Sequence, residues 1–459
     1  MSTAGAASAI GTAGASGAIT ARYGDAFAQL DGAGRSNAPG WLAELRKSAL
    51  AEFTAVGFPT TRNEDWHFTS VTPIAERAFR NAKPLPPGTA AAHTPAELLA
   101  AVIGDAAWPR AVFVNGRFDA ALSSLGAIGG GARVTTLAAA LKDTPDFVAA
   151  HLGKLATFNK QAFTAFNTAF AQDGLVVRVA RGTRVEAPLH VIHVADAQAA
   201  GCMVHPRILA VVEPLAEFGL VESYVSLKGT EYFTNAVTEI DIGNGARVHH
   251  YKVQHESTEA FHVGTVQVAQ GRDSVFHSFS YASGAALSRT NVYTTLSGEA
   301  AEARLNGLYM VDGSQHADHQ TFVEHVAPGC ASRELYKGIL DGSAHGVFNG
   351  KVFVDPEAQK TDGKQSNHAL LLSPTARVDA KPQLEIFADD VKCTHGSTVG
   401  RLDELALFYM KSRGIGADNS RALLTYAFAA EVLETVELDA LRAGLERIAF
   451  ERFTHTEQQ

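Results

Sequence analysis

Residues 175–194 read LVVRVARGTRVEAPLHVIHV, in which two short runs rich in valine and isoleucine, 175–179 and 189–194, flank a polar turn. Short runs with many β-branched side chains, bounded by turn residues, predict β-strands. Segments of the same kind follow one another to about residue 400, and helical spacing almost disappears over this region. The middle of the chain is therefore predicted to consist of many short strands.

Turn-forming residues punctuate this strand region at a nearly constant interval. They occur at Gly243–Gly245, Gly271–Asp273 and Gly298–Glu299, roughly 27 residues apart, and a new alternating segment follows each of them. A sustained period of about 20 to 50 residues is typical of stacked coils, in which each coil buries its inner face against its neighbours. The spacing favours a β-helix or related β-solenoid, although a sandwich of many short strands would give similar local patterns.

The composition is that of a globular chain with room for more than one structural unit. Of the 459 residues, 46% are hydrophobic and 19% are charged, and no apolar run reaches the roughly 18 residues that a membrane helix needs. A net charge of −9 argues against general binding to nucleic acid, which requires a basic surface to neutralise phosphates. We therefore expect neither a membrane nor a nucleic acid as partner.

Cysteine content and the N-terminal composition bear on the compartment. Three cysteines, Cys202, Cys330 and Cys393, are too few for a disulfide framework and fit a reducing environment. The first twenty residues are mostly Ala, Gly, Ser and Thr, and no Lys or Arg precedes Arg22, so the basic segment of a secretory signal is missing. This composition predicts a disordered leader over residues 1–36 and a cytoplasmic protein.

Helical periodicity appears on both sides of the strand region. An apolar face at Trp41, Leu42, Leu45, Leu50 and Phe53 ends before Gly57 and Pro59, which break the helix. The sequence therefore predicts an N-terminal helical and mixed domain over 37–172, a β-helix core over 173–400 and a C-terminal helical domain over 401–459.

Three helices are expected in the C-terminal domain. The first should be capped by Asp403 and end at Gly414 and Gly416, and the third should run from about Asp439 to Phe453. The residues expected on the buried faces of the first two helices are Leu405, Leu407 and Phe408, followed by Leu423, Leu424, Ala427 and Phe428.

A Cys-x-His pair follows a strand-like stretch in residues 381–396, which read KPQLEIFADDVKCTHG. Residues at i and i+2 of a strand point to the same face, so Cys393 and His395 could reach one metal or one sulfide together. A thiolate binds iron or accepts sulfur, a nearby imidazolium would favour that thiolate, and a neutral imidazole could ligate iron itself. Two such ligands leave a four-coordinate site half complete.

Four further segments are informative about the family: Gly346–Val352, Ala358–Asp362, Asn367–Leu372 and Phe408–Ile415. Together with residues 381–396, they resemble the SufD branch of the SufB/SufD family of iron–sulfur cluster assembly scaffold proteins, in the family's order and over most of residues 310–435. Residues 59–69, which include Glu64-Asp65-Trp66, are similar to a Glu-x-Trp element of this family, and we expect Trp66 to be a packing anchor. The SufD branch is favoured over SufB because His395 follows Cys393 and because the chain has only three cysteines.

The resemblance implies a right-handed parallel β-helix core and a non-ATPase scaffold subunit of a SufBCD-type complex. It implies that a SufB-like paralogue pairs along the β-helix edge and completes a transient iron–sulfur cluster site with Cys393 and His395. It also implies that a SufC-like ABC-type ATPase docks on the C-terminal helices. No tightly bound cofactor is expected, participation of a flavin is left open, and an exposed edge could let the isolated chain form a homodimer.

The sequence gives less support to other functions. There is no phosphate-binding Gly-x-x-x-x-Gly-Lys-Ser/Thr loop, so we expect no ATP hydrolysis by this chain. A carbohydrate-active β-helix enzyme is one alternative, but such enzymes are usually exported; an inert structural adaptor is another. Zinc could be held by residue types such as His316, His319, His325 and Cys330. On a strand, however, side chains three residues apart point to opposite faces, so this segment is expected to be structural or interfacial.

Overall fold

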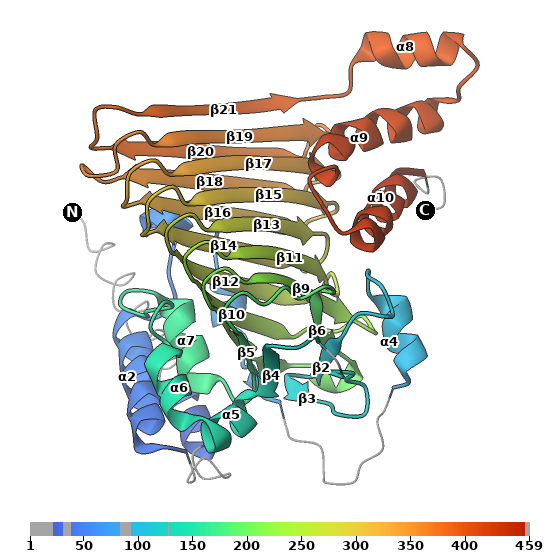
Figure 1. Cartoon of the computed structure of the whole chain (residues 1–459). Helices are drawn as coiled ribbons and strands as arrows, with labels where there is room; N and C mark the ends of the chain where they lie inside the picture. The colour runs from blue at the N-terminus through green and yellow to red at the C-terminus, as the bar shows by residue number, and fades with distance from the viewer. Residues whose placement is uncertain (1–21, 31–37, 83–92, 127, 455–459) are drawn as a thin grey trace, which may run out of the picture.

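The chain forms a parallel β-solenoid in which two long sheets lie face to face, with helices near both ends of the chain (Figure 1). The computed structural model describes residues 22–30, 38–82, 93–126 and 128–454. From β8 to β21, consecutive strands alternate between the two sheets, so that this part of each sheet is built from every second strand. The predicted solenoid is confirmed.

The first sheet, sheet A, has eleven strands: β1 (Arg80–Asn81), β4 (Ala132–Thr136), β5 (Leu175–Val179), β7 (Cys202–Val204), β8 (Arg207–Val212), β10 (Phe233–Ile242), β12 (Phe261–Gln270), β14 (Leu287–Leu296), β16 (His316–His325), β18 (His345–Val354) and β20 (Arg377–Ile386). The second, sheet B, has ten: β2 (Arg110–Val114), β3 (Arg117–Phe118), β6 (Leu189–Ala195), β9 (Glu217–Ser226), β11 (Arg247–His255), β13 (Val275–Ala282), β15 (Glu302–Val311), β17 (Ala331–Leu340), β19 (Asp362–Leu371) and β21 (Lys392–Gly400).

The register of sheet A gives the length of one solenoid turn. Thr265 pairs with Asn291, Asn291 with Gln320 and Gln320 with Asn349, in steps of 26, 29 and 29 residues. The interval expected from the turn residues agrees with these steps. Because the pairing is parallel and direct, each side chain stacks on its counterpart one turn away.

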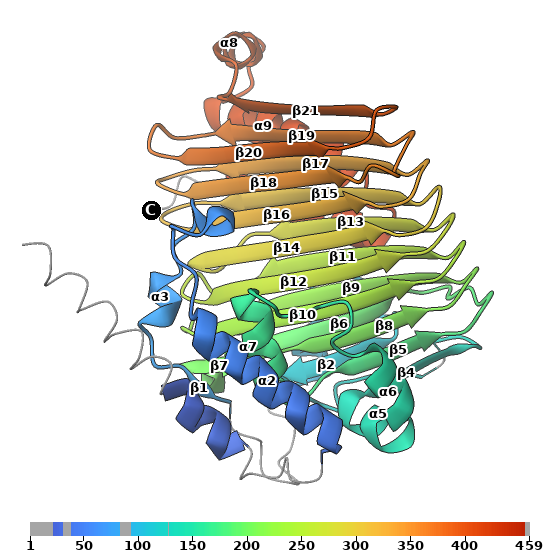
Figure 2. The ribbon, with the colours of Figure 1, turned by 90° about the vertical axis from the view of Figure 1, so that its left-hand side faces the viewer.

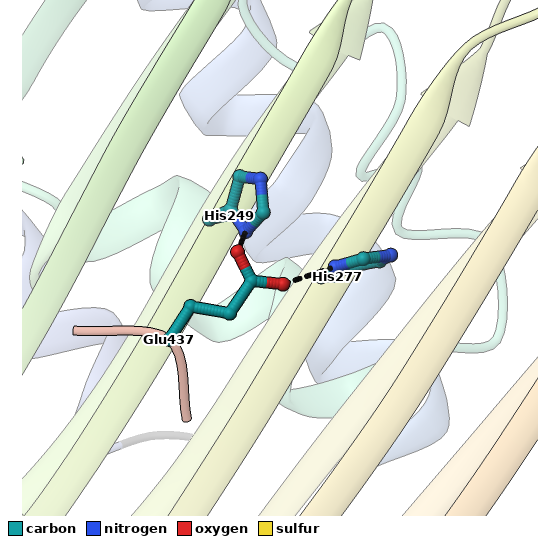
Figure 3. A group of neighbouring side chains, drawn as sticks. All are labelled: His249, His277 and Glu437. Atoms are coloured by element: carbon teal, nitrogen blue, oxygen red, sulfur yellow. Dashed lines mark hydrogen bonds and ion pairs between the residues drawn. The ribbon is translucent and has the colours of Figure 1, made fainter. Parts of the chain in front are cut away.

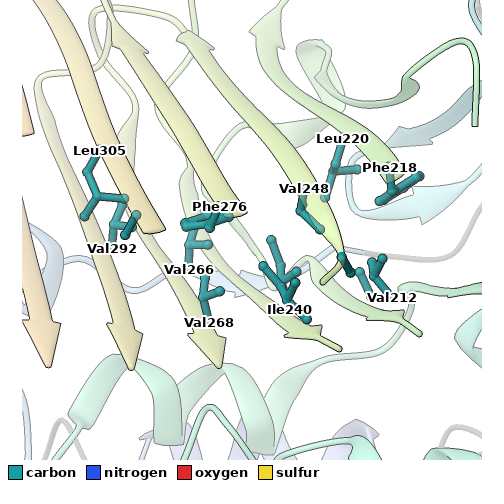
Figure 4. Packing of buried hydrophobic residues seen from close by; sticks show 14 of the residues in the cluster. Val212, Phe218, Leu220, Ile240, Val248, Val266, Val268, Phe276, Val292 and Leu305 are labelled. Carbon is teal, nitrogen blue, oxygen red and sulfur yellow. The ribbon is translucent and has the colours of Figure 1, made fainter. Parts of the chain in front are cut away.

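Alternate side chains of each strand fill the space between the sheets. Val266 and Val292 from sheet A meet Phe276 and Leu305 from sheet B in one continuous apolar core, and all four are almost fully buried (Figure 4). The β-branched residues that predicted strands are therefore also the residues that hold the two sheets together.

The N-terminal helices cover the outer face of sheet A in its first turns (Figure 2). They are α2 (Gly40–Val56), α3 (Thr72–Ala75), α5 (Leu137–Asp143), α6 (Pro145–His151) and α7 (Ala162–Phe170), while α4 (Pro95–Ala101) lies beside sheet B. Two 3₁₀ turns, η2 (Glu64–Trp66) and η3 (Ala197–Ala199), complete this part. As predicted, α2 ends at Gly57, which has a positive φ of 66°.

Most of residues 1–36, for which a disordered leader is expected, lies outside the described residues. Residues 22–30, however, form a helix. Its Tyr23 is fully buried and packs edge-on against Phe53 and Phe166, which belong to α2 and α7. Burial of one large aromatic ring supplies the packing that the composition of this segment does not suggest.

The C-terminal helices are α8 (Glu404–Ser412), α9 (Ala417–Leu433) and α10 (Asp439–Thr454). Asp403 caps α8 as expected, since its side chain accepts a hydrogen bond from the Leu405 amide at 2.8 Å. The expected face of α8 is wrong, however, because only Leu407 is buried, whereas Leu405 is 77% and Phe408 72% exposed.

The expected face of α9 is only partly right, since Leu424 and Phe428 are half-buried and Phe428 packs toward sheet B, whereas Ala427 is exposed. The fully buried side chains of α9 include Ala429, Val432 and Leu433, which pack with α10 against the outer face of sheet B, whereas Leu423 is exposed. No helix in the described part of the chain has the length and apolar character to cross a membrane.

Buried histidines are a second feature of the solenoid. Burial lowers the pKa of His190 to about 3 and that of His193, His316, His319 and His325 to about 4. These rings are thus neutral in the folded protein, whereas in the unfolded chain they bind a proton below a pKa of about 6.5. The free energy of unfolding should therefore fall as the pH decreases from about 6.5 to 4, and change little through these groups above pH 7.

We expect His319→Phe to remove one such contribution. The ring of His319 stacks on Tyr309 with centroids 5.1 Å apart, and neither ring nitrogen has a hydrogen-bond partner. Between pH 7 and pH 4, the wild type should lose up to about 3 kcal/mol more unfolding free energy than the variant. Urea unfolding at a series of pH values measures this difference. A pH profile of His319→Phe that runs parallel to the wild-type profile would contradict the prediction.

Candidate functional site

Cys393 and His395 lie on β21, the last strand of sheet B. Strand β21 pairs with β19 on one side, and no described strand pairs with its other edge. Cys393 is opposite Gly363 and His395 is opposite Gln365. Cys393 is half-buried and packs against the inner core, while His395 is exposed. Because the two residues are two positions apart on one strand, both side chains lie on the inner face of the final turn.

The final turn is an uncovered end of the solenoid. Nearly every residue of β20 and β21 is exposed or half-buried, in contrast to the preceding turns. Large apolar side chains reach solvent here, with Phe387 60% and Val399 53% exposed. A stacked-coil fold normally closes its ends with a polar cap, so an apolar open end is typical of a surface that another chain covers.

Two buried polar residues lie beneath His395 on the inner face of sheet B. Gln365 is opposite His395, and Glu334 of β17 is opposite Gln365, so the three form successive rungs of one column. The Gln365 side chain donates a hydrogen bond to Glu334 at 3.2 Å. Gly350 makes room for it, since a Cβ there would lie 2.1 Å from the amide nitrogen of Gln365.

Glu334 is a functional candidate that the sequence did not reveal. Burial raises its pKa to about 7, although hydrogen bonds from Thr321 and Gln365 act in the opposite direction. One of its carboxyl oxygens has no hydrogen-bond partner. A carboxyl group with a pKa near neutrality can accept or give up a proton under ordinary conditions. It lies two rungs below His395 in the same column of sheet B.

The electrostatics of Cys393 differ from the expectation of a favoured thiolate. Burial raises the pKa of the Cys393 thiol, the Asp362 carboxylate raises it further, and a hydrogen bond with the Gly363 backbone offsets this only in part. The free thiol is therefore protonated at neutral pH. Binding of a metal would have to displace this proton, which makes ligation by Cys393 dependent on pH.

The zinc-type residues of the sequence are not brought together. His316 bonds to Thr69 at 2.9 Å on the outer face of sheet A, whereas His319 is buried between the sheets. His325 bonds to Ser332 inside the solenoid. As expected for a strand, the side chains at 316 and 319 point to opposite faces. The only described group of three or more possible ligands within 4.8 Å of one another is His249, His277 and Glu437.

Trp66 is an anchor, as expected. Its ring stacks on the guanidinium of Arg289 of β14 at 3.6 Å and lies 5.1 Å from the ring of Phe163. Glu64 forms an ion pair with Lys381 of β20 at 2.8 Å. The segment around Trp66 thus ties the N-terminal part to the outer face of sheet A.

Comparison with known proteins covers nearly the whole chain. Residues 18–191 match a family model described as the SufBD protein N-terminal region, and residues 193–428 match one described as the SufBD core domain of SUF system FeS cluster assembly. An iron–sulfur cluster assembly SufBD family protein of Synechocystis sp. is 34% identical over 415 residues, which are 88% of this chain and 89% of that protein.

Two proteins named SufD are also similar. The iron–sulfur cluster assembly protein SufD of Escherichia coli (strain K12) is 33% identical over 86% of this chain and 89% of its own length. SufD of Bacillus subtilis (strain 168) is 27% identical over 62% of this chain and 66% of its own length. The core-domain match includes β21, and with it Cys393 and His395.

Proposed function

Because the chain belongs to the SufBD family of iron–sulfur cluster assembly proteins, we propose that it is a non-catalytic scaffold subunit of a SufBCD-type complex. In this proposal Cys393 and His395 bind a nascent cluster at an interface with a SufB-like subunit. The cluster is cargo that is assembled and passed on. The complex would act in the cytoplasm, and ATP hydrolysis would occur in a SufC-like partner.

The observation that carries the proposal is the uncovered final turn. It presents a thiol and an imidazole on one face, next to exposed apolar side chains and a free strand edge. A partner that adds a strand to β21 would bury this apolar surface and satisfy the main-chain groups of the edge. The same partner would bring the ligands that a two-residue site lacks.

We propose that α8 is the docking element for the ATPase. This helix projects away from the rest of the molecule (Figure 1) and exposes Leu405, Phe408 and Tyr409. Three large apolar side chains on one short helix resemble the anchors that contribute most of the affinity at protein interfaces. Docking there would also explain why α8 does not bury these residues within its own domain.

Replacing Leu405 and Phe408 together by Asp should weaken binding of the SufC-like ATPase on the order of 1,000-fold, since each lost anchor costs about 2 kcal/mol. The SufB-like subunit should still co-purify, because β21 is unchanged. Leu215→Asp is the matched control, since Leu215 is also exposed, at 59%, but lies in a solenoid turn. ATPase affinity that is equal in the double variant and the control would exclude α8.

Co-expression with SufB-like and SufC-like proteins tests the proposed function as a whole. We expect a stable complex that forms an iron–sulfur absorption band on anaerobic reconstitution with iron and sulfide. In the absence of partners, a second copy is expected to cover β20 and β21, and size-exclusion chromatography with light scattering should detect this homodimer. A chain that ignores both partners would refute the proposal.

A further inference from the structure

His249, His277 and Glu437 meet on the outer face of sheet B, far along the solenoid from β21 (Figures 1 and 3). His249 of β11 and His277 of β13 are direct partners in the parallel ladder, which holds their rings side by side. Glu437 comes from the loop between α9 and α10. Its two carboxylate oxygens lie 3.3 Å from Nδ1 of His249 and 3.2 Å from Nδ1 of His277.

We propose that these three residues bind a divalent transition-metal ion where the C-terminal helices join sheet B. Two imidazoles and one carboxylate are a donor set that zinc and iron(II) both accept. With metal–ligand bonds of about 2.0 to 2.1 Å, neighbouring ligand atoms of a tetrahedral site are roughly 3.4 Å apart. Each imidazole nitrogen lies at about this distance from a different carboxylate oxygen, and ligand atoms of all three residues lie within 4.8 Å of one another, so small side-chain shifts would let them converge on one ion.

Residues around His277 also favour metal binding at this group. The other ring nitrogen of His277, Nε2, has no hydrogen-bond partner and lies 3.9 Å from the carboxylate of Glu302. Arg304 donates a hydrogen bond to Glu302 at 2.5 Å and holds that carboxylate in place. A carboxylate behind a metal-bound histidine fixes the ring and strengthens it as a ligand. In the proposed site Glu302, which Arg304 holds in place, would act as a positioning residue once its carboxylate closes to hydrogen-bond distance of Nε2.

Space remains for a fourth ligand. A cavity of about 250 Å³ adjoins the group and is lined by His277 and Glu437 together with Tyr251, Asn306 and Thr435. Three protein ligands with an accessible fourth position are typical of sites that hold water or an exchangeable ligand. The group contains no thiolate and shares no residue with the pair on β21. The inference therefore does not rest on the proposed function.

Titration of the full-length chain with Co²⁺ tests the site, because bound cobalt gives visible absorption that reports its ligands. Cys393→Ala/His395→Ala is used as the background, so that the pair on β21 cannot contribute. We expect one equivalent of Co²⁺ in this background, displaced by Zn²⁺. His277→Ala and Glu437→Gln should each abolish the band, and Glu302→Gln should weaken Co²⁺ binding about 10-fold to 100-fold.

His368→Ala is the matched control, since His368 is another histidine on the outer face of sheet B and bonds to Thr398. This variant should bind Co²⁺ like the background. Circular dichroism checks that each variant is folded. If His277→Ala does not fold, Glu437→Gln still tests the site, because it removes the carboxylate and keeps the size of the side chain. The proposal is overturned if the background gives no band, which would leave the group a hydrogen-bonded contact only. It is equally overturned if the band survives both ligand substitutions.

Discussion

Replacing Cys393 and His395 together by alanine should abolish the iron–sulfur absorption band of the reconstituted complex, while the three subunits still co-purify. Both side chains belong to a strand whose outer edge pairs with no described strand, and His395 is exposed, so their truncation should cost little folding energy. Under the proposed function, loss of the thiol and the imidazole would, in contrast, remove both cluster ligands that we assign to this chain. Anaerobic reconstitution followed by absorption spectroscopy measures the effect.

Single variants separate the two ligands. His395→Ala should lower cluster formation at every pH. Cys393→Ser should remove the pH dependence of cluster formation that arises from displacing the thiol proton. Thr394→Ala is the matched control, because Thr394 lies between the two on the same strand and points to the opposite face. Normal cluster formation by the double variant in an intact complex would mean that the chain is an inert adaptor.

The strands could be predicted from sequence because their signal is local. The runs that begin at Leu175 and Leu189 become β5 and β6, and the turn spacing gives the turn length, since every turn repeats the same burial on its inner face. The faces of α8 and α9 could not be predicted in full this way. Which stripe of a helix is buried depends on the surface it meets, and Phe408 meets none within the described chain.

Part of the candidate site could likewise be predicted from the sequence, and part could not. Cys393 and His395 are two residues apart on one strand, so their common face follows from the period of a strand. Glu334 and Gln365 join them only through the register of β17, β19 and β21, one full turn apart at each step. No fixed sequence spacing identifies Glu334 and Gln365 as neighbours of His395, because the number of residues in a turn varies.

A buried ion pair joins the N-terminal helices to the solenoid. Arg207 of β8 and Glu239 of β10 form a salt bridge on the outer face of sheet A, and both side chains are almost fully buried. Glu239 also accepts hydrogen bonds from the backbone amides of Gly153, Leu155 and Ala156, at 2.9 to 3.1 Å. These amides lie between α6 and α7, so one carboxylate satisfies a charge and three main-chain donors.

Glu239→Ala should therefore lower the free energy of unfolding by about 3 to 5 kcal/mol, because it leaves three amides unpaired and removes the counter-charge of a buried guanidinium, which keeps only its hydrogen bonds to Asn167 and Thr168. Adding Arg207→Met should recover part of this loss, since the uncompensated charge is then removed. Urea unfolding measures both. Glu213→Ala is the control: its partner Arg178 is exposed, so the cost should be about 0 to 1 kcal/mol. Equal losses for Glu239→Ala and Glu213→Ala would show that desolvation of the pair does not govern the attachment of the helices.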